Sequence, residues 1–131
     1  MSGGAIQKAL VVEDCGRVRR ATASQLHDWG FSVEAAATVR EARGLVAAAG
    51  GYDLVLVDRN LADADGLDLV RDLHARRDPG RQSILVLTTE STRESILESL
   101  AAGADEYLMK PCDPESLGNK LALLGFGEKI A

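Results

Sequence analysis

Residues 54 to 66 read LVLVDRNLADADG. Leu54 to Val57 are apolar on both alternating faces, which is typical of a strand covered by helices on both sides. Asp58 follows directly. An ionised carboxylate at the end of a buried strand is unfavourable unless a cation, hydrogen bonds or chemistry compensates for it. The stretch therefore predicts a buried strand that ends in a functional carboxylate.

Strand-like and helix-like segments alternate along the whole chain. Strand-sized apolar runs occupy residues 8–13, 31–36, 52–58, 83–88 and 106–110. Helical periodicity follows each of them, over residues 17–29 and 38–49 and around residues 69–73, 96–101 and 117–124. Five repeats of strand then helix predict an α/β fold, a doubly wound five-stranded parallel sheet with helices on both faces.

Apolar stripes predict which side of each helix packs on the sheet. The stripe of the first helix is expected to be Val18, Ala21, Leu26 and Trp29. The stripe of the fourth is expected to be Ile96, Leu97, Leu100 and Ala101. Thr38 with Glu41, and Asp113 before Pro114, have the spacing of residues that begin a helix.

Length and composition favour one compact domain. The 131 residues are 46% hydrophobic, enough for a single core, which we expect to span residues 8–124 between short tails at 1–7 and 125–131. The net charge of −5 and the scattered Lys and Arg argue against direct binding of nucleic acid. No apolar run has the length of a signal peptide or membrane span, so we expect a cytoplasmic protein without membrane insertion.

Polar side chains gather at the carboxyl ends of the predicted strands. The set is Glu13, Asp14, Asp58, Thr88, Thr89 and Lys110. Ligands of such sheets bind beyond this edge, near the point where strand order reverses. Three clustered carboxylates repel one another, and Mg²⁺ with oxygen ligands is the usual remedy. A lysine and a threonine could then hold a tetrahedral anion, which points to phosphoryl chemistry with Asp58 as the candidate nucleophile.

Four motifs in order give the chain a resemblance to a known family. They are VVED at 11–14, LVLVD with Gly66 eight residues after Asp58, LVLT ending at Thr88, and YLMKP at 107–111. From about Lys8 to Leu124 the chain resembles the receiver domain of two-component response regulators, the family of the single-domain chemotaxis regulator. The resemblance implies a flavodoxin-like fold. It also implies that Asp58 accepts a phosphoryl group from a phosphohistidine on a sensor histidine kinase or a histidine phosphotransfer protein.

The resemblance also implies roles for the other site residues. Asp14 and Asp58 would coordinate Mg²⁺, Glu13 would act largely through water, and Asn60 would offer its backbone carbonyl. Thr88 and Lys110 would contact the phosphoryl oxygens. Tyr107 matches an aromatic switch position that moves together with Thr88. Phosphorylation would then alter the face built from the fourth helix, the fifth strand and the fifth helix, where a downstream protein target would bind.

Some positions depart from the family pattern. Ala62 stands where proline is frequent, so the loop after Asp58 is expected to be looser. Thr89 replaces a smaller residue and could narrow access to Asp58. Cys15 and Cys112 flank site residues and are expected to be reduced thiols.

Several functions remain open from sequence. A signalling phosphoacceptor would catalyse only its own phosphorylation and dephosphorylation, and would not be an enzyme in the usual sense. A degenerate receiver would bind partners without phosphorylation. A Mg²⁺-dependent phosphohydrolase would want an aspartate where Asn60 stands, and a flavin-binding electron carrier would want a Ser/Thr/Gly-rich loop where the chain reads EDCGRVRR. The sequence is compatible with a monomer and with a phosphorylation-dependent dimer. It is also compatible with a free-standing receiver and with a piece of a larger regulator.

Overall fold

Strands and helices alternate throughout the computed structural model, which describes residues 6–49, 51–76, 82–90 and 92–127. The strands in these ranges are β1 (Lys8–Val12), β2 (Ser32–Ala36), β3 (Leu54–Asp58), β4 (Ser83–Thr88) and β5 (Glu106–Met109). The helices are α1 (Gly16–Asp28), α2 (Val39–Ala49), α3 (Gly66–Arg76), α4 (Arg93–Ala102) and α5 (Pro114–Leu123). No helix of the described part is long and apolar enough to cross a membrane.

The strands form one parallel sheet in the order β2-β1-β3-β4-β5. The predicted doubly wound, five-stranded α/β fold is confirmed. From β1 the chain winds outward to β2, then returns to β3 on the other side of β1, so the strand order reverses between β1 and β3. Ligands of open α/β sheets bind at the carboxyl edge of such a reversal, which here is the edge that holds Asp58.

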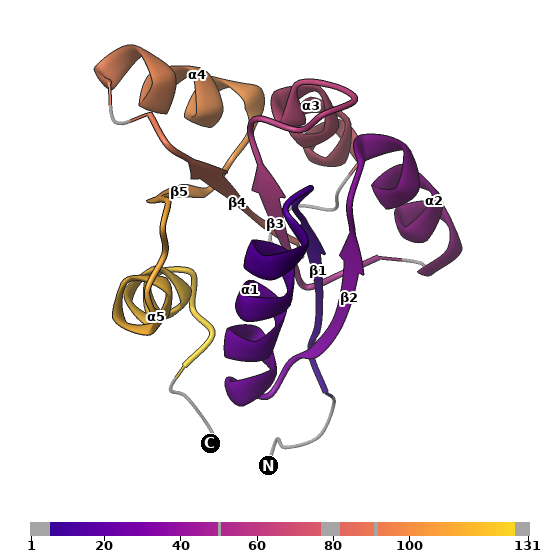
Figure 1. The fold of residues 1–131 in the computed structure, drawn as a ribbon, viewed down its shortest axis with the longest axis vertical. Helices are drawn as coiled ribbons and strands as arrows, with labels where there is room; N and C mark the ends of the chain where they lie inside the picture. Colours follow the sequence, from indigo (N-terminus) through magenta and orange to yellow (C-terminus); the bar gives the residue numbers. More distant parts are fainter. Residues whose placement is uncertain (1–5, 50, 77–81, 91, 128–131) are drawn as a thin grey trace.

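Alternate residues of each buried strand face two separate cores. In β3, Val55 and Val57 pack with residues of α2 and α3, whereas Leu54 and Leu56 pack with Leu26 of α1 and with residues of α5. Figure 1 shows the same division, with α1 and α5 on one face of the sheet and α2, α3 and α4 on the other. Burial on both faces explains why LVLV is apolar at every position.

The apolar stripe predicted for α4 is wrong. The buried side chains of this helix are Ser95, Ser99 and Ala102. Leu97 is 52% exposed and Leu100 is 41% exposed. Apolar periodicity identified the helix correctly but not its inner face, because the side chains that pack inward are small or can form hydrogen bonds, and the pattern does not count these as core residues.

The stripe predicted for α1 is confirmed only in part. Leu26 is buried, and Trp29 packs beside α5, where a Cβ added to Gly118 would lie 3.2 Å from the indole ring. Ala21, however, is exposed, and Thr22 takes the buried position next to it. Phe126, in the predicted tail, packs edge-on against Phe31 with ring centroids 5.2 Å apart.

Candidate functional site

Asp58 ends β3 as a buried carboxylate, with 2% of the residue exposed. One carboxylate oxygen, Oδ1, accepts a hydrogen bond from the backbone N–H of Asn60 at 3.0 Å. The other, Oδ2, accepts a hydrogen bond from Lys110 Nζ at 3.1 Å. Both oxygens are therefore held in fixed directions, and the charge of the carboxylate is partly compensated.

Glu13 and Asp14 follow β1 and have different environments. Glu13 is fully buried and its Oε2 accepts the backbone N–H of Cys15 at 3.1 Å, whereas Asp14 is exposed. Arg19, one turn into α1, donates to the backbone carbonyls of Glu13 at 2.8 Å and of Asp14 at 3.4 Å. The arginine thus fixes the backbone that carries both acids. No motif in the sequence marks Arg19 as a residue of the site, because its contacts are to backbone carbonyls.

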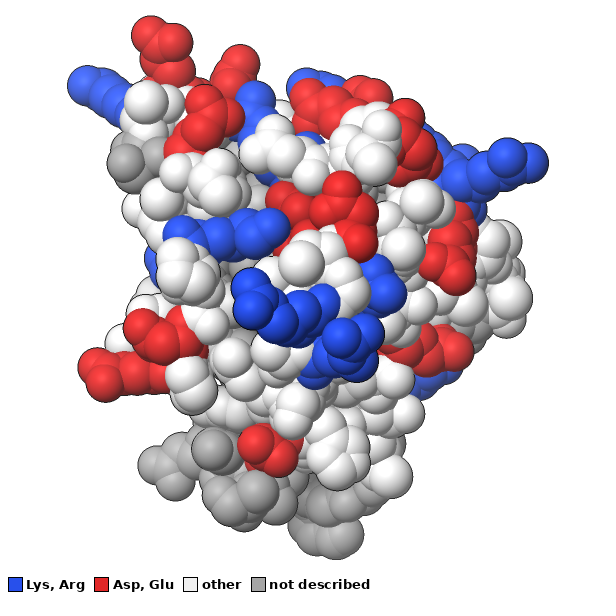
Figure 2. All heavy atoms as spheres, viewed as in Figure 1, with Lys and Arg blue, Asp and Glu red and all other residues white. Residues whose placement is uncertain are grey.

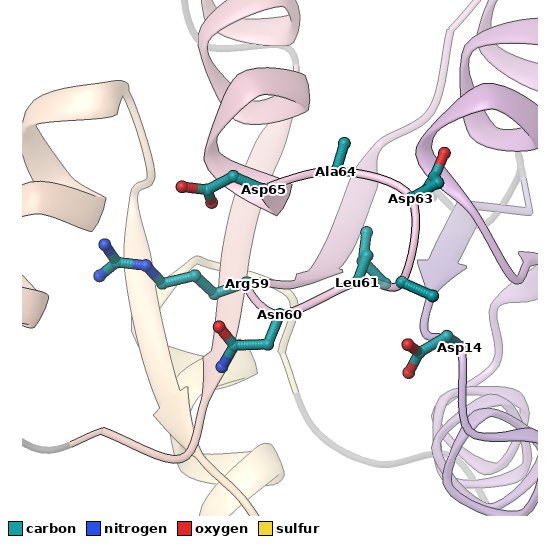
Figure 3. Close-up of a pocket in the computed structure, with 8 residues that line it drawn as sticks. Asp14, Arg59, Asn60, Leu61, Asp63, Ala64 and Asp65 are labelled. Atoms are coloured by element: carbon teal, nitrogen blue, oxygen red, sulfur yellow. The ribbon is translucent and has the colours of Figure 1, made fainter.

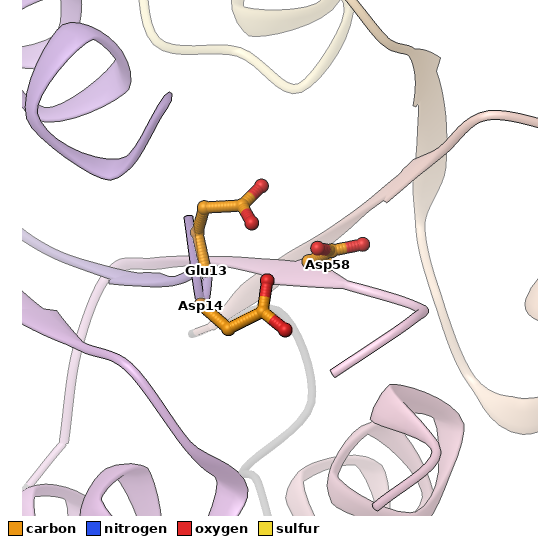
Figure 4. A group of neighbouring side chains, drawn as sticks. All are labelled: Glu13, Asp14 and Asp58. Carbon is orange, nitrogen blue, oxygen red and sulfur yellow. The ribbon is translucent and has the colours of Figure 1, made fainter. Parts of the chain in front are cut away.

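The three carboxylates converge at the carboxyl edge of β1 and β3 (Figure 4). One oxygen from each of Glu13, Asp14 and Asp58 lies within 4.8 Å of the other two. Such an arrangement concentrates negative charge, and a hard divalent cation with oxygen ligands relieves the repulsion. The predicted grouping of these acids is therefore present, and the donor set fits Mg²⁺.

Lys110, which follows β5, supplies the positive charge of the site. Its Nζ forms an ion pair with Glu13 at 2.7 Å, in addition to the hydrogen bond to Asp58. Burial alone would lower the pKa of Lys110, but the hydrogen bonds and charges of Glu13 and Asp58 outweigh it and raise the pKa above its usual value. The ammonium group therefore stays charged. The Lys110–Pro111 peptide bond is cis.

Thr88 and Tyr107 lie on the neighbouring strands β4 and β5. Thr88 is buried, and its Oγ1 accepts the backbone N–H of Glu90 at 3.0 Å, so the hydroxyl is engaged by the loop that leads to α4. Tyr107 is partly buried. Lys120 Nζ lies 4.4 Å from the centre of its ring and 2.7 Å from Glu106. Thr88 thus contacts the loop before α4, and Tyr107 contacts α5 through Lys120.

Comparison with known proteins decides the family. The model of the response regulator receiver domain matches residues 9–122. The chain belongs to this family. It is 33% identical over 119 residues to the chemotaxis protein CheY-3 of Vibrio cholerae, covering 87% of this chain and 88% of that protein. The two-component response regulator PhoP of Pseudomonas aeruginosa is 37% identical over 118 residues, which are 89% of this chain and 51% of PhoP.

A solved structure is similar over almost the full length. The chemotaxis response regulator CheY4 of Vibrio cholerae superimposes with a TM-score of 0.83 at 32% identity, over 92% of this chain and 99% of that one. The chain is thus a receiver domain of the two-component response regulator type. Receiver domains are signalling proteins, and response regulators interact with sensor kinases and downstream targets.

The loop after Asp58 in this receiver is held by several contacts. Gly66 is required by close approach, since a Cβ there would lie 2.2 Å from the backbone oxygen of Asp58. Asp63 accepts the backbone N–H groups of Val39 at 3.1 Å and Arg40 at 3.2 Å at the start of α2. Backbone hydrogen bonds from Val39, and to a smaller extent Arg40, keep the pKa of Asp63 below its usual value despite desolvation. Asp63 therefore anchors the loop to α2, although Ala62 replaces the usual proline.

An open pocket of about 610 Å³ lies against this loop (Figure 3). Its lining consists of Asp14 and the loop residues Arg59, Asn60, Leu61, Ala62, Asp63, Ala64 and Asp65. Of the three clustered carboxylates, Asp14 lines this pocket, whereas Glu13 and Asp58 are buried beside it.

Basic side chains border the acidic edge. The first turn of α1 carries no acidic residue and contains Arg17 and Arg19, and Arg20 follows it. In Figure 2, Lys and Arg side chains gather over the region where Figure 1 draws α1, directly below a group of Asp and Glu. Arginines in the first turn oppose the helix dipole, and the neighbouring carboxylates offset that cost.

Proposed function

We propose that this receiver domain is a phosphoacceptor that takes a phosphoryl group on Asp58 in a Mg²⁺-dependent reaction. The observation that carries the proposal is the state of Asp58, a buried carboxylate whose two oxygens are held by Asn60 and Lys110 beside two further acids. Buried carboxylates that gather with a lysine at the ligand-binding edge of an open α/β sheet are candidates for a functional site.

In the proposed reaction, one carboxylate oxygen of Asp58 attacks the phosphorus of a phosphohistidine on the partner. A new O–P bond forms, the P–N bond breaks, and the electron pair leaves with the imidazole. The carboxylates of Asp14 and Asp58 and the backbone carbonyl of Asn60 would hold Mg²⁺, with Glu13 acting largely through water. When bound, the cation supplies positive charge to the transferring phosphoryl oxygens.

Lys110 and Thr88 would stabilise the phosphorylated state. The ammonium group of Lys110, already 3.1 Å from Asp58, offers a fixed positive charge for the phosphoryl oxygens. The Thr88 hydroxyl would turn from Glu90 to a phosphoryl oxygen. Because the Glu90 N–H would then lose its acceptor, the loop that leads to α4 would shift, and this is the proposed link between chemistry and signal.

The proposed output is a change in the face formed by α4, β5 and α5. This face exposes Leu97 and Leu100, and it carries the contact between Tyr107 and Lys120. Exposed apolar side chains rimmed by charged ones suit binding of a downstream protein. We propose a histidine kinase or a histidine phosphotransfer protein as the phosphoryl source, and a cytoplasmic location for the exchange.

The proposal is tested by intact-protein mass spectrometry after incubation with acetyl phosphate. The expected result is a phosphoryl adduct that needs Mg²⁺ and is lost in Asp58→Asn. Asp105→Asn serves as the matched control, because Asp105 is exposed at the opposite end of β5 and should leave the adduct unchanged. An unmodified wild type that also fails to bind beryllium fluoride would favour a degenerate receiver instead.

A further inference from the structure

The side chain directly after Asp58 reaches away from the carboxylates to α4. The guanidinium of Arg59 donates from Nη1 to Ser95 Oγ at 2.7 Å and to the Ser95 carbonyl at 3.2 Å. Nη2 pairs with Glu98 at 2.7 Å. Only 13% of the Arg59 side chain is exposed. Figure 3 shows Arg59 directed to the side of the loop opposite to Asp63 and Asp14.

The backbone of Arg59 has little freedom. Its N–H donates to the carbonyl of Leu87 in β4 at 2.9 Å, and its carbonyl accepts the N–H of Gly66 at 2.8 Å. If α4 moves relative to the Asp58 loop, the Arg59 backbone cannot follow it. The Arg59 side chain must then change conformation, or its hydrogen bonds to Ser95 must break.

Apolar burial contributes little to the attachment of α4. Its inner face consists of Ser95, Ser99 and Ala102, whereas the neighbouring α3 buries Leu67, Leu69, Val70 and Leu73. Burial of a leucine side chain contributes far more to stability than burial of a serine, which has little apolar surface to bury. Hydrogen bonds from a charged donor to a buried acceptor are stronger than neutral ones, so the Arg59–Ser95 bonds are strong polar contacts between the Asp58 loop and α4.

We infer that Arg59 is a positioning residue that holds α4 in its unphosphorylated position, through its hydrogen bonds to Ser95. Loss of these bonds releases the helix toward the position it takes after phosphorylation. Arg59 thus shifts the equilibrium between the two positions of α4 in the unphosphorylated protein toward the first. The inference rests on the proposed function, because it takes α4 to be part of the face that phosphorylation switches.

The first test needs no phosphorylation. Hydrogen exchange of the full chain, followed by mass spectrometry, compares wild type with Arg59→Met, which keeps an aliphatic side chain but removes the donors. We expect amides of residues 93–102 to exchange about tenfold faster, with those of α3 unchanged. Arg71→Met is the matched control, since Arg71 pairs with Asp68 at the exposed surface of α3. Unchanged exchange in α4 of a folded Arg59→Met would overturn the inference.

Ser95→Ala tests the same contact from the other side. It keeps Arg59 and removes the Oγ acceptor, so α4 should exchange faster by a smaller factor than in Arg59→Met. Glu98→Gln should have little effect, because Glu98 is 61% exposed and surface ion pairs contribute little. If Arg59→Met does not fold, unchanged α4 exchange in Ser95→Ala overturns the inference.

A second arm adds acetyl phosphate and Mg²⁺ and compares the proteins at equal phosphorylated fraction. Phosphorylation should speed α4 exchange in wild type, and the additional increase in Arg59→Met should be smaller because the helix is already released. An equal increase in both proteins would overturn the inference. If wild type takes no phosphoryl group, the proposed function fails, whereas the first comparison still decides whether Arg59 holds α4.

Discussion

The carboxylate edge and α4 belong to the same small domain but are attached to it in opposite ways. At the edge, Asp58 ends a strand in which every residue is buried, and its charge is compensated by Lys110 and a backbone N–H. α4 places serines against the domain and leaves Leu97 and Leu100 toward solvent. The chain thus holds its clustered carboxylates within a buried sheet edge and attaches α4 largely through small and polar side chains.

Truncation of one leucine in each region measures this difference most directly. Leu56→Ala removes a fully buried side chain of β3 and should lower the free energy of unfolding by about 2–5 kcal/mol. Leu97→Ala removes a half-exposed one and should change it by no more than about 0.5 kcal/mol. Urea unfolding provides both values. Comparable losses would show that α4 is anchored by its leucines after all.

Mg²⁺ should stabilise the carboxylate edge by mass action. At a concentration one hundred times its dissociation constant, a ligand of the folded state adds about 2.7 kcal/mol. Thermal unfolding with Mg²⁺ and with a chelator would reveal this gain in wild type. Asp14→Asn should lose most of it, while Glu94→Gln, an exposed acid of α4, should retain it. Equal gains in the two variants would argue against the carboxylate group as the metal site.

Two glycines allow a matched test of how rigid the edge is. Gly66→Ala would bring a Cβ to 2.2 Å from the Asp58 carbonyl, and the forced shift should cost about 1–3 kcal/mol in unfolding free energy. Gly44→Ala, in α2 with no atom within 4 Å of the added Cβ, should instead stabilise by about 0.5–1 kcal/mol. Chemical unfolding measures both, and a tolerated Gly66→Ala would mean that the loop after Asp58 yields easily.

Substitution of Asp63 should have the smallest effect on the free energy of unfolding, and this effect should depend on pH. Because backbone hydrogen bonds lower its pKa in the folded state, its contribution is present above the unfolded value, about 3.9, and is lost as pH falls through the folded value. Asp63→Ala should therefore be less stable than wild type at pH 7, with a difference that shrinks in strong acid. Asp63→Asn keeps an acceptor without a proton to titrate, so its difference from Asp63→Ala should stay constant between these conditions.

Sequence predicted the fold because the three central strands follow one simple rule. Runs buried on both faces, such as LVLV and ILVL, need helices on both sides of the sheet, and β1, β3 and β4 are such runs. The edge strands β2 and β5 are less buried, but their alternation with helices still predicts a parallel sheet. Local helix signals were equally informative. Asp113 begins α5 by accepting the N–H of Ser116 at 2.7 Å, and Thr38 accepts that of Glu41 at 3.0 Å, as their spacing predicted.

The position of the acids was predictable as well, because carboxyl ends of neighbouring parallel strands meet at one edge. Contacts made by long side chains between distant segments could not be predicted from the sequence. Arg59 looks like any surface arginine in sequence, and its partner Ser95 lies 36 residues away. Asp63 reaches α2 from a separate loop. The inner face of α4 escaped prediction for a related reason, since serines replace the apolar residues that reveal a buried face.

The central claim is that Asp58, among three adjacent acids, is the group that accepts phosphate. Borohydride reduction of the protein after reaction with acetyl phosphate, followed by peptide mapping, tests it most directly, because an acyl phosphate is reduced to an alcohol that marks the modified residue. We expect the mark on Asp58, and only when Mg²⁺ is present during the reaction. A mark on Glu13 or Asp14 in wild type, with Asp58 unmodified, would contradict it.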